Sequence, residues 1–242
     1  MLGEYDARLV ALSALVATLA SYTAFDVVSR MGARESWRAY GWLLAGALAL
    51  GTGIWATHFV AMIGFELPVN MAYDFRVVVL SWAIAVSASG VALNASTRPG
   101  KPVHRLLLGS VALTFGIASM HYTGMHAMHV EPGIEYDPIL ILVSVVASFA
   151  GSLAALRIAV FLRQPRSRGG FGRKIAASLV LATSIAAIHY IGMAAARFSV
   201  GSAFGTAAAL DSVLLATLVG ASTLVFLGIA LVVSIQDRRI ES

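Results

Sequence analysis

A histidine followed four positions later by a methionine occurs three times in this chain, and an aromatic residue directly follows each His. The pairs are His58 with Met62, His121 with Met125, and His189 with Met193. Imidazole and thioether are neutral ligands that suit a borderline or soft cation such as copper. Because the three His are 63 and 68 positions apart, the motif belongs to an internal repeat. We therefore expect one shared copper site built from the three His, with one or more of the three Met completing the set of ligands.

Packing gives a second interpretation of the same residues. Met fills irregular gaps, a His in a membrane can simply hydrogen-bond a neighbouring helix, and gene duplication would copy either one. An ionisable side chain inside a bilayer is costly and usually functional, which favours metal binding.

The composition predicts a multi-pass membrane protein in a lipid bilayer. Of the 242 residues, 59% are hydrophobic and 12% are charged, and the mean hydropathy is +0.83. A soluble domain has about 25% charged residues. The absence of Cys excludes disulfides and thiolate ligands. The net charge of +5 is spread along the chain, so no nucleic-acid partner is expected.

Apolar runs long enough to cross a bilayer predict an all-α protein with seven transmembrane helices. The runs cover 8–29, 40–65, 76–96, 105–130, 138–162, 173–197 and 208–235. No tract remains for a soluble domain, so residues 1–242 are expected to form one membrane domain. Glu4 and Asp6 precede the first run, which favours a retained span over a cleaved signal peptide. Of the 17 Lys and Arg, 14 fall on one side of this topology, and the positive-inside rule then places the N-terminus outside and the C-terminus in the cytoplasm.

The spans also repeat in pairs. Small residues at spacing four mark the odd spans: Ser13, Ala17 and Ser21, then Ser81, Ala85 and Ser89, then Ser144, Ser148 and Ser152. Such stripes let membrane helices approach closely. The His and Met share one face and one depth in the even spans. This predicts three helix-pair repeats, 8–66, 76–131 and 138–197, around a pseudo-threefold axis, with the helix 208–235 outside the repeat.

Further side chains flank the expected site. Tyr122 and Tyr190 are expected to orient the imidazoles through their hydroxyls, a role that Phe59 cannot perform. Four more residues are candidates for the surroundings of the site or for capture of incoming metal, and an ordinary interfacial role is the favoured alternative for the two His among them. They are Met120, His126, Met128 and His129.

A polar cluster is expected at the cytoplasmic ends of the odd spans. Asp26, Asn94 and Arg157 lie at the same offset, 13 residues after Ser13, Ser81 and Ser144. If they face the axis, the acid and the base neutralise each other and the amide bridges them. The local alternative is a weak contact between Asp26 and Arg30 in the same helix, with Arg157 reaching toward the membrane surface.

Taken together, these residues resemble the MHYT domain of bacterial membrane sensors. The resemblance rests on Met120-His121-Tyr122-Thr123 and its two echoes, on Ala20-Ser21-Tyr22-Thr23-Ala24, and on the pairs Tyr73-Asp74 and Tyr136-Asp137. The echoes depart from the pattern: Thr57 and Ile188 replace the first Met, and Val60 and Ile191 replace the Thr. The resemblance implies copper near the outer face of a bacterial inner membrane, and sensing of oxygen, carbon monoxide or nitric oxide. It also implies an output through a cytoplasmic signalling domain, of which no GGDEF-type sequence is present here.

Sensing is therefore the expected function, and an enzyme is not expected. No outer-half span carries an acid, and no nucleophile stands beside a base. Copper transport or storage is one alternative, although the inner halves of the even spans are apolar and rich in Gly and Ala. A haem held by two of the three His is another. A homo-oligomer is compatible with all three.

Overall fold

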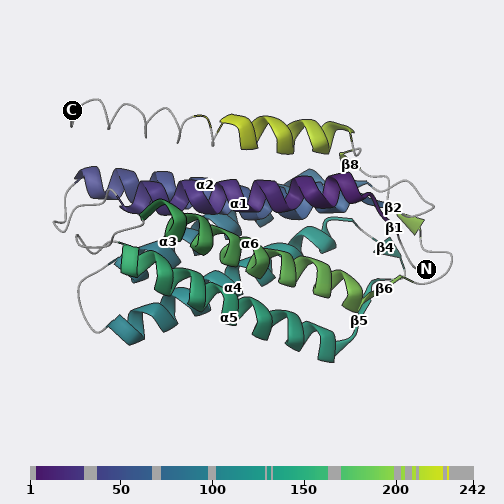
Figure 1. Cartoon of the computed structure of the whole chain (residues 1–242). Helices are drawn as coiled ribbons and strands as arrows, with labels where there is room; N and C mark the ends of the chain where they lie inside the picture. The colour runs from purple at the N-terminus through teal and green to yellow at the C-terminus, as the bar shows by residue number, and fades with distance from the viewer. Residues whose placement is uncertain are drawn as a thin grey trace.

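The structure is a computed structural model that describes residues 4–29, 37–66, 72–97, 102–128, 130–131, 133–162, 170–198, 203–204, 209–210, 213–225 and 228. Six long helices form a bundle (Figure 1). They are α1 (Ala7–Ser29), α2 (Trp37–Ile63), α3 (Phe75–Thr97), α4 (Pro102–His126), α5 (Pro138–Leu162) and α6 (Gly170–Ala195). These bounds agree with the first six predicted spans to within four residues. A shorter apolar helix, Val213–Val225, lies within the predicted seventh span, most of whose remainder is outside the described residues.

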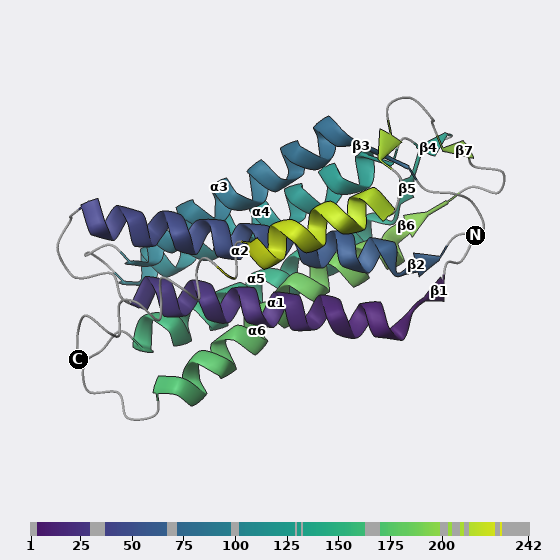
Figure 2. The ribbon, with the colours of Figure 1, turned by 90° about the horizontal axis from the view of Figure 1, so that it is seen from above.

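Short antiparallel strand pairs gather at one end of the bundle, which we call the strand end (Figure 2). The pairs are β1 (Glu4–Tyr5) with β2 (Phe65–Glu66), β3 (Tyr73–Asp74) with β8 (Ala209–Leu210), β4 (Val130–Glu131) with β7 (Ala203–Phe204), and β5 (Glu135–Tyr136) with β6 (Ala196–Arg197). In register, Tyr5 lies opposite Phe65 and Tyr136 opposite Ala196. The other end, where α1 ends and α2 begins, is the loop end.

An aspartate fixes the start of each odd helix to the end of the even helix in the same repeat. The backbone N–H of Asp6 donates to the carbonyl of Gly64 at 2.9 Å, and Asp137 does the same to Ala195 at 2.9 Å. Asp74 makes the equivalent bond to Ala127 at 2.8 Å. Each Asp side chain also caps its own helix by accepting from a backbone N–H two residues later. The two helices of a repeat are thereby joined at the strand end.

The even helices lie at the centre of the bundle. α2, α4 and α6 contact one another, and each odd helix packs against two even ones: α1 on α2 and α6, α3 on α2 and α4, α5 on α4 and α6. A side chain on an even helix can therefore reach the other two repeats directly.

Small residues bring the two helices of each repeat together. A Cβ on Gly53 would overlap the methyl group of Ala20, and a Cβ on Gly116 would overlap that of Ala88. The third repeat reverses the pair, because the glycine is on the odd helix there, and a Cβ on Gly151 would lie 2.8 Å from the Cβ of Ser184. On the odd helices these crossing points are Ala20, Ala88 and Gly151, each one residue before a member of the predicted stripe and not in the stripe itself.

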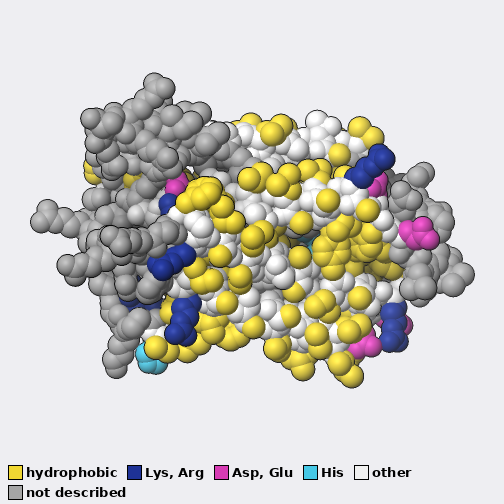
Figure 3. Space-filling model, viewed as in Figure 1, with side chains coloured by type: hydrophobic (Ala, Val, Ile, Leu, Met, Phe, Trp, Pro, Cys, Tyr) yellow, Lys and Arg dark blue, Asp and Glu magenta, His cyan; other side chains and the backbone are white. Residues whose placement is uncertain are grey.

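The bundle has the surface of a membrane protein. All six long helices are long and apolar enough to span a bilayer, and the protein is therefore a multi-pass membrane protein. On the face shown in Figure 3, Lys, Arg, Asp and Glu lie toward the two ends, with apolar side chains between them. Large apolar side chains such as Phe115 and Leu142 are 72% and 62% exposed, as lipid contact requires.

Candidate metal centre

His58, His121 and His189 meet at one point between α2, α4 and α6. The Nδ1 atom of His58 lies 3.0 Å from Nδ1 of His189 and 3.1 Å from Nδ1 of His121. The ligand nitrogens of the three rings are all within 4.8 Å of one another. The three His therefore converge, as their shared register in the repeat predicted. Each His lies five or six residues before the end of its helix.

The three imidazoles form a closed cluster. Their ring centroids are 4.9, 5.1 and 5.3 Å apart, and the rings meet edge to face. The side chains are only 1–2% exposed. Because a neutral imidazole carries one N–H and one lone pair, three Nδ1 atoms facing one point leave lone pairs opposed unless a proton or a cation lies between them.

The nitrogens fit a small metal ion. With metal–nitrogen bonds of about 2.0–2.1 Å, three ligands in trigonal or tetrahedral arrangement lie about 3.3–3.6 Å apart. The observed separations of 3.0 and 3.1 Å are within a few tenths of an ångström of that range. A proton on one nitrogen satisfies one of these two contacts, whereas a metal ion can bind all three nitrogens.

The predicted sulfur ligands are all buried. Met62 and Met125 are 1% exposed and Met193 is 5% exposed. Met120 and Met128, expected near the site, are buried as well. Ligation by any of these sulfurs remains a prediction.

An aromatic collar surrounds the His cluster on its side toward the strand end. The residue after each His stacks edge-on against that His at 4.7–4.9 Å between centroids. Each of these residues also meets a tyrosine that precedes an odd helix. The pairs, which define the aromatic collar, are Phe59 with Tyr73, Tyr122 with Tyr136, and Tyr190 with Tyr5.

The aromatic residues of the collar differ in their side-chain hydroxyls and in the hydrogen bonds that these make. The Tyr190 hydroxyl hydrogen-bonds the hydroxyl of Ser13 at 2.8 Å, which links α6 to α1. Phe59 has no hydroxyl for such a bond. Burial, with a smaller contribution from Tyr122, raises the pKa of Tyr136 to about 12, so that hydroxyl stays protonated at neutral pH.

A pocket opens beside one of these pairs. Its volume is about 410 Å³, and Tyr122, Tyr136, Met125, His126 and Glu131 are among the residues that line it. His126 and Glu131 are exposed, whereas Met125 is buried. The pocket thus extends from the surface of the strand end to Tyr122, whose ring contacts His121. His129, which was expected in this region, is outside the described residues.

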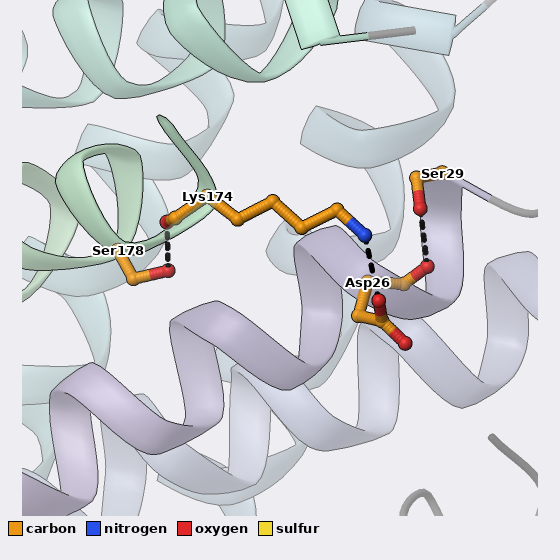
Figure 4. Close-up of polar contacts among 4 residues, drawn as sticks. All are labelled: Asp26, Ser29, Lys174 and Ser178. Atoms are coloured by element: carbon orange, nitrogen blue, oxygen red, sulfur yellow. Dashed lines mark hydrogen bonds and ion pairs between the residues drawn. The ribbon is translucent and has the colours of Figure 1, made fainter. Parts of the chain in front are cut away.

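At the loop end the structure gives Asp26 a partner other than the expected Arg157. Asp26 is 6% exposed, and its carboxylate accepts a hydrogen bond from Lys174 Nζ at 2.6 Å (Figure 4). Arg157 is exposed on α5, and Asn94 is partly buried near the end of α3. The reason is the position of α1, which packs on the even helices α2 and α6, so its carboxylate meets a base on α6. The local Asp26–Arg30 alternative involves a residue outside the described part.

Two elements of the arrangement were missed at the level of sequence. Tyr5-Asp6 is a third Tyr-Asp pair: Tyr73-Asp74 follows it by 68 residues and Tyr136-Asp137 follows Tyr73-Asp74 by 63, which are the repeat offsets. That signal was available and identifies both the collar and the helix caps. Lys174 gave no such signal, because the repeat does not make its position equivalent to that of Asp26.

A family model matches three segments of the chain, 51–109, 115–172 and 183–240, and is described as a bacterial signalling protein N-terminal repeat, MHYT. The chain belongs to the MHYT family. In the frame of that model each unit begins in an even helix, so the third unit takes in the helix Val213–Val225 and α1 precedes the first.

Relatives of this MHYT domain are larger signalling proteins. It is 43% identical over 243 residues to the bifunctional diguanylate cyclase/cyclic di-GMP phosphodiesterase MucR of Pseudomonas aeruginosa. This match covers 100% of this chain and 35% of MucR. It is also 43% identical over 219 residues to the cyclic di-GMP phosphodiesterase NbdA of the same organism, and 36% identical over 195 residues to the signaling protein YkoW of Bacillus subtilis. These matches cover 89% and 80% of this chain, but 28% and 24% of the two relatives. No solved structure matches the chain.

Proposed function

We propose that this MHYT domain is a membrane sensor that binds one copper ion through Nδ1 of His58, His121 and His189. The observation that carries the proposal is the convergence of three buried imidazole nitrogens, two of them 3.0 and 3.1 Å from the third. One or more of Met62, Met125 and Met193 complete the set of ligands. Neutral nitrogen and sulfur ligands without a carboxylate suit copper better than a hard cation.

The contact between the rings argues against haem. A haem iron with two His ligands has the macrocycle between the two imidazoles. Here the rings touch one another, with centroids about 5 Å apart, which leaves no gap for a porphyrin.

Metal analysis of detergent-purified protein tests the proposal. We expect one copper per chain after loading with Cu(I), and X-ray absorption with Cu–N distances of about 2 Å. His121→Ala should lose at least ~100-fold in affinity, since it removes a ligand outright. His104→Ala is the matched control on the same helix, because His104 is exposed at the loop end. Equal copper binding by the two variants would overturn the proposal.

We propose further that occupancy or redox state of this site is the sensed quantity, with a diatomic gas as the ligand. Sensing requires a ligand that binds two conformations with different affinity. The central even helices contact all three repeats, so a shift at the His cluster would reach every repeat. Copper-loaded protein exposed to carbon monoxide should change its vibrational or optical spectrum. A spectrum unchanged by any of the three gases would favour copper storage or transport instead.

The direction of signalling follows from the proposed orientation, with the strand end outside. The basic residues predicted on the cytoplasmic side include Arg105, Arg157 and Lys174 near the loop end. Because the chain has no Cys, single cysteines test this cleanly. An impermeant thiol reagent added to cells should label Glu135→Cys and spare His104→Cys; both positions are exposed. The reverse labelling would contradict the orientation.

The output proposed for the domain is a cytoplasmic signalling activity, as the names of MucR and NbdA suggest. The chain spans about a third or less of these relatives.

We also propose that a pseudo-threefold axis through the His cluster relates the repeats. The equivalent aspartate bonds, collar pairs and helix crossings support it.

A further inference from the structure

The outer edges of the three imidazoles are closed off by protein. Since the Nδ1 atoms face the centre, the Nε2 atoms point away from it. All three Nε2 atoms are buried, and none has a hydrogen-bond partner among the residues that the structure describes. A His that binds metal usually donates its second N–H to a carboxylate, a carbonyl or a water, which raises its basicity. No described residue gives this cluster such support.

Glycines from the following repeat produce this closure. Gly124 on α4 lies so close to Nε2 of His58 that an added Cβ would overlap the ring. Gly192 on α6 stands in the same relation to His121, where a Cβ would lie 2.7 Å from Nε2. Both glycines come three residues after a His. The residue at that place in the first repeat is Ala61, which is completely buried.

The charge of the bound ion is therefore left uncompensated. Within the part of the chain that the structure describes, the cluster contains three neutral His and no Asp or Glu. The rings are 1–2% exposed, so water does not screen the ion either. The cost of burying an ion rises with the square of its charge, which makes a divalent cation about four times as costly as a monovalent one of equal size.

We infer that the His cluster selects Cu(I) over divalent ions, and that Gly124 and Gly192 determine this selectivity by closing the Nε2 edges of His58 and His121. The inference rests on the proposed function, because it assumes that the cluster binds metal. By repeat equivalence we expect Ala61, which is completely buried, to face the Nε2 edge of His189. The site then holds the reduced form of copper, and oxidation to Cu(II) weakens binding.

Competition titrations of the full chain in detergent test this selectivity. The probes are Cu(I) under anaerobic conditions against a chromophoric chelator, Ag(I) as a monovalent ion without redox chemistry, and Zn(II). Cu(I) and Ag(I) should each bind at one per chain, and a hundredfold excess of Zn(II) should displace neither. Displacement by Zn(II) at equal concentration would overturn the inference and leave the proposed metal site intact. Failure of all three ions to bind would overturn both.

Two glycine-site variants test the residues named. Gly192→Ala forces a Cβ against His121 and should weaken Cu(I) binding about 10-fold or more. The matched control is Gly41→Ala on α2, where an added Cβ has nothing within 4 Å. Should Gly192→Ala fail to fold, Ala61→Gly decides the matter: it opens space beside His189, and the ratio of Cu(I) to Zn(II) affinity should fall several-fold. An unchanged ratio would contradict the role of these positions.

Discussion

The two ends of the bundle use equivalent repeat positions differently. Near the strand end, one position from each repeat comes together, as His58, His121 and His189. At the loop end, Asp26 is paired with Lys174, while Arg157, at its repeat-equivalent position, is exposed. The His are on the even helices, which contact one another at the centre, whereas Asp26 is on α1, which packs on the even helices α2 and α6. Repeat equivalence therefore predicts proximity only for residues on the central helices.

The largest expected effect on stability is at the loop end. Asp26→Asn leaves Lys174 beside a buried neutral group and should lower the free energy of unfolding by about 2–3 kcal/mol, because breaking a largely buried ion pair leaves one charge uncompensated. Thermal unfolding in detergent measures this. Copper binding near the strand end should stay unchanged, which would show that the two ends act independently.

A charge swap sharpens the same comparison. The double variant Asp26→Lys with Lys174→Asp should recover part of the lost stability. The matched control, Asp26→Arg with Arg157→Asp, should recover none, since Arg157 is exposed on α5, which packs mainly on α4 and α6. Recovery in the control and not in the Lys174 swap would show that the odd helices do meet at the loop end.

A smaller effect is expected between the two ends, where Gly53 crosses Ala20. Gly53→Ser places a side chain into the methyl group of Ala20 and should destabilise by about 1–3 kcal/mol through overpacking. Adding Ala20→Gly recreates the Gly151–Ser184 pair of the third repeat and should restore most of the loss in a thermal unfolding series. If the double variant is no better than the single one, the repeats are not interchangeable at this crossing.

In the aromatic collar the effect should be smaller again. Tyr190→Phe removes the hydrogen bond to Ser13 and should cost about 1 kcal/mol of stability. Copper affinity should change by no more than a few-fold, because the ring still packs on His189. The control Phe59→Tyr adds a hydroxyl at the equivalent place and should not lose stability. A collapse of copper binding in Tyr190→Phe would assign the hydroxyl a direct part in the site.

The smallest effect concerns access to the site. If the pocket beside Tyr122 and Tyr136 admits the metal, His126→Ala should slow copper loading several-fold and leave equilibrium affinity unchanged, since His126 is exposed and outside the cluster. Stopped-flow loading against a chelator separates rate from affinity. A lower affinity with an unchanged rate would instead place His126 among the ligands.

Sequence alone determined the membrane class, six of the helices and the identity of the three central His. The physical reason is that each rests on a local or periodic signal: apolar runs of fixed length, and a motif repeated at offsets of 63 and 68. The same offsets contained the Tyr5-Asp6 pair, which completes the collar and the helix caps. The helix Val213–Val225 shows the limit of this approach, because its repeat membership depends on where a unit is taken to begin.

Only the tertiary structure decided which repeated positions meet. Asp26 and Arg157 look as equivalent in sequence as the His residues do, yet α6 supplies the base that Asp26 contacts. The glycines against the Nε2 edges of His58 and His121 likewise appear in sequence as ordinary small residues of a membrane helix. Periodicity specifies the face and the depth of a side chain, but the order of helices around the bundle specifies its neighbour, and that order is set by packing between segments far apart in the chain.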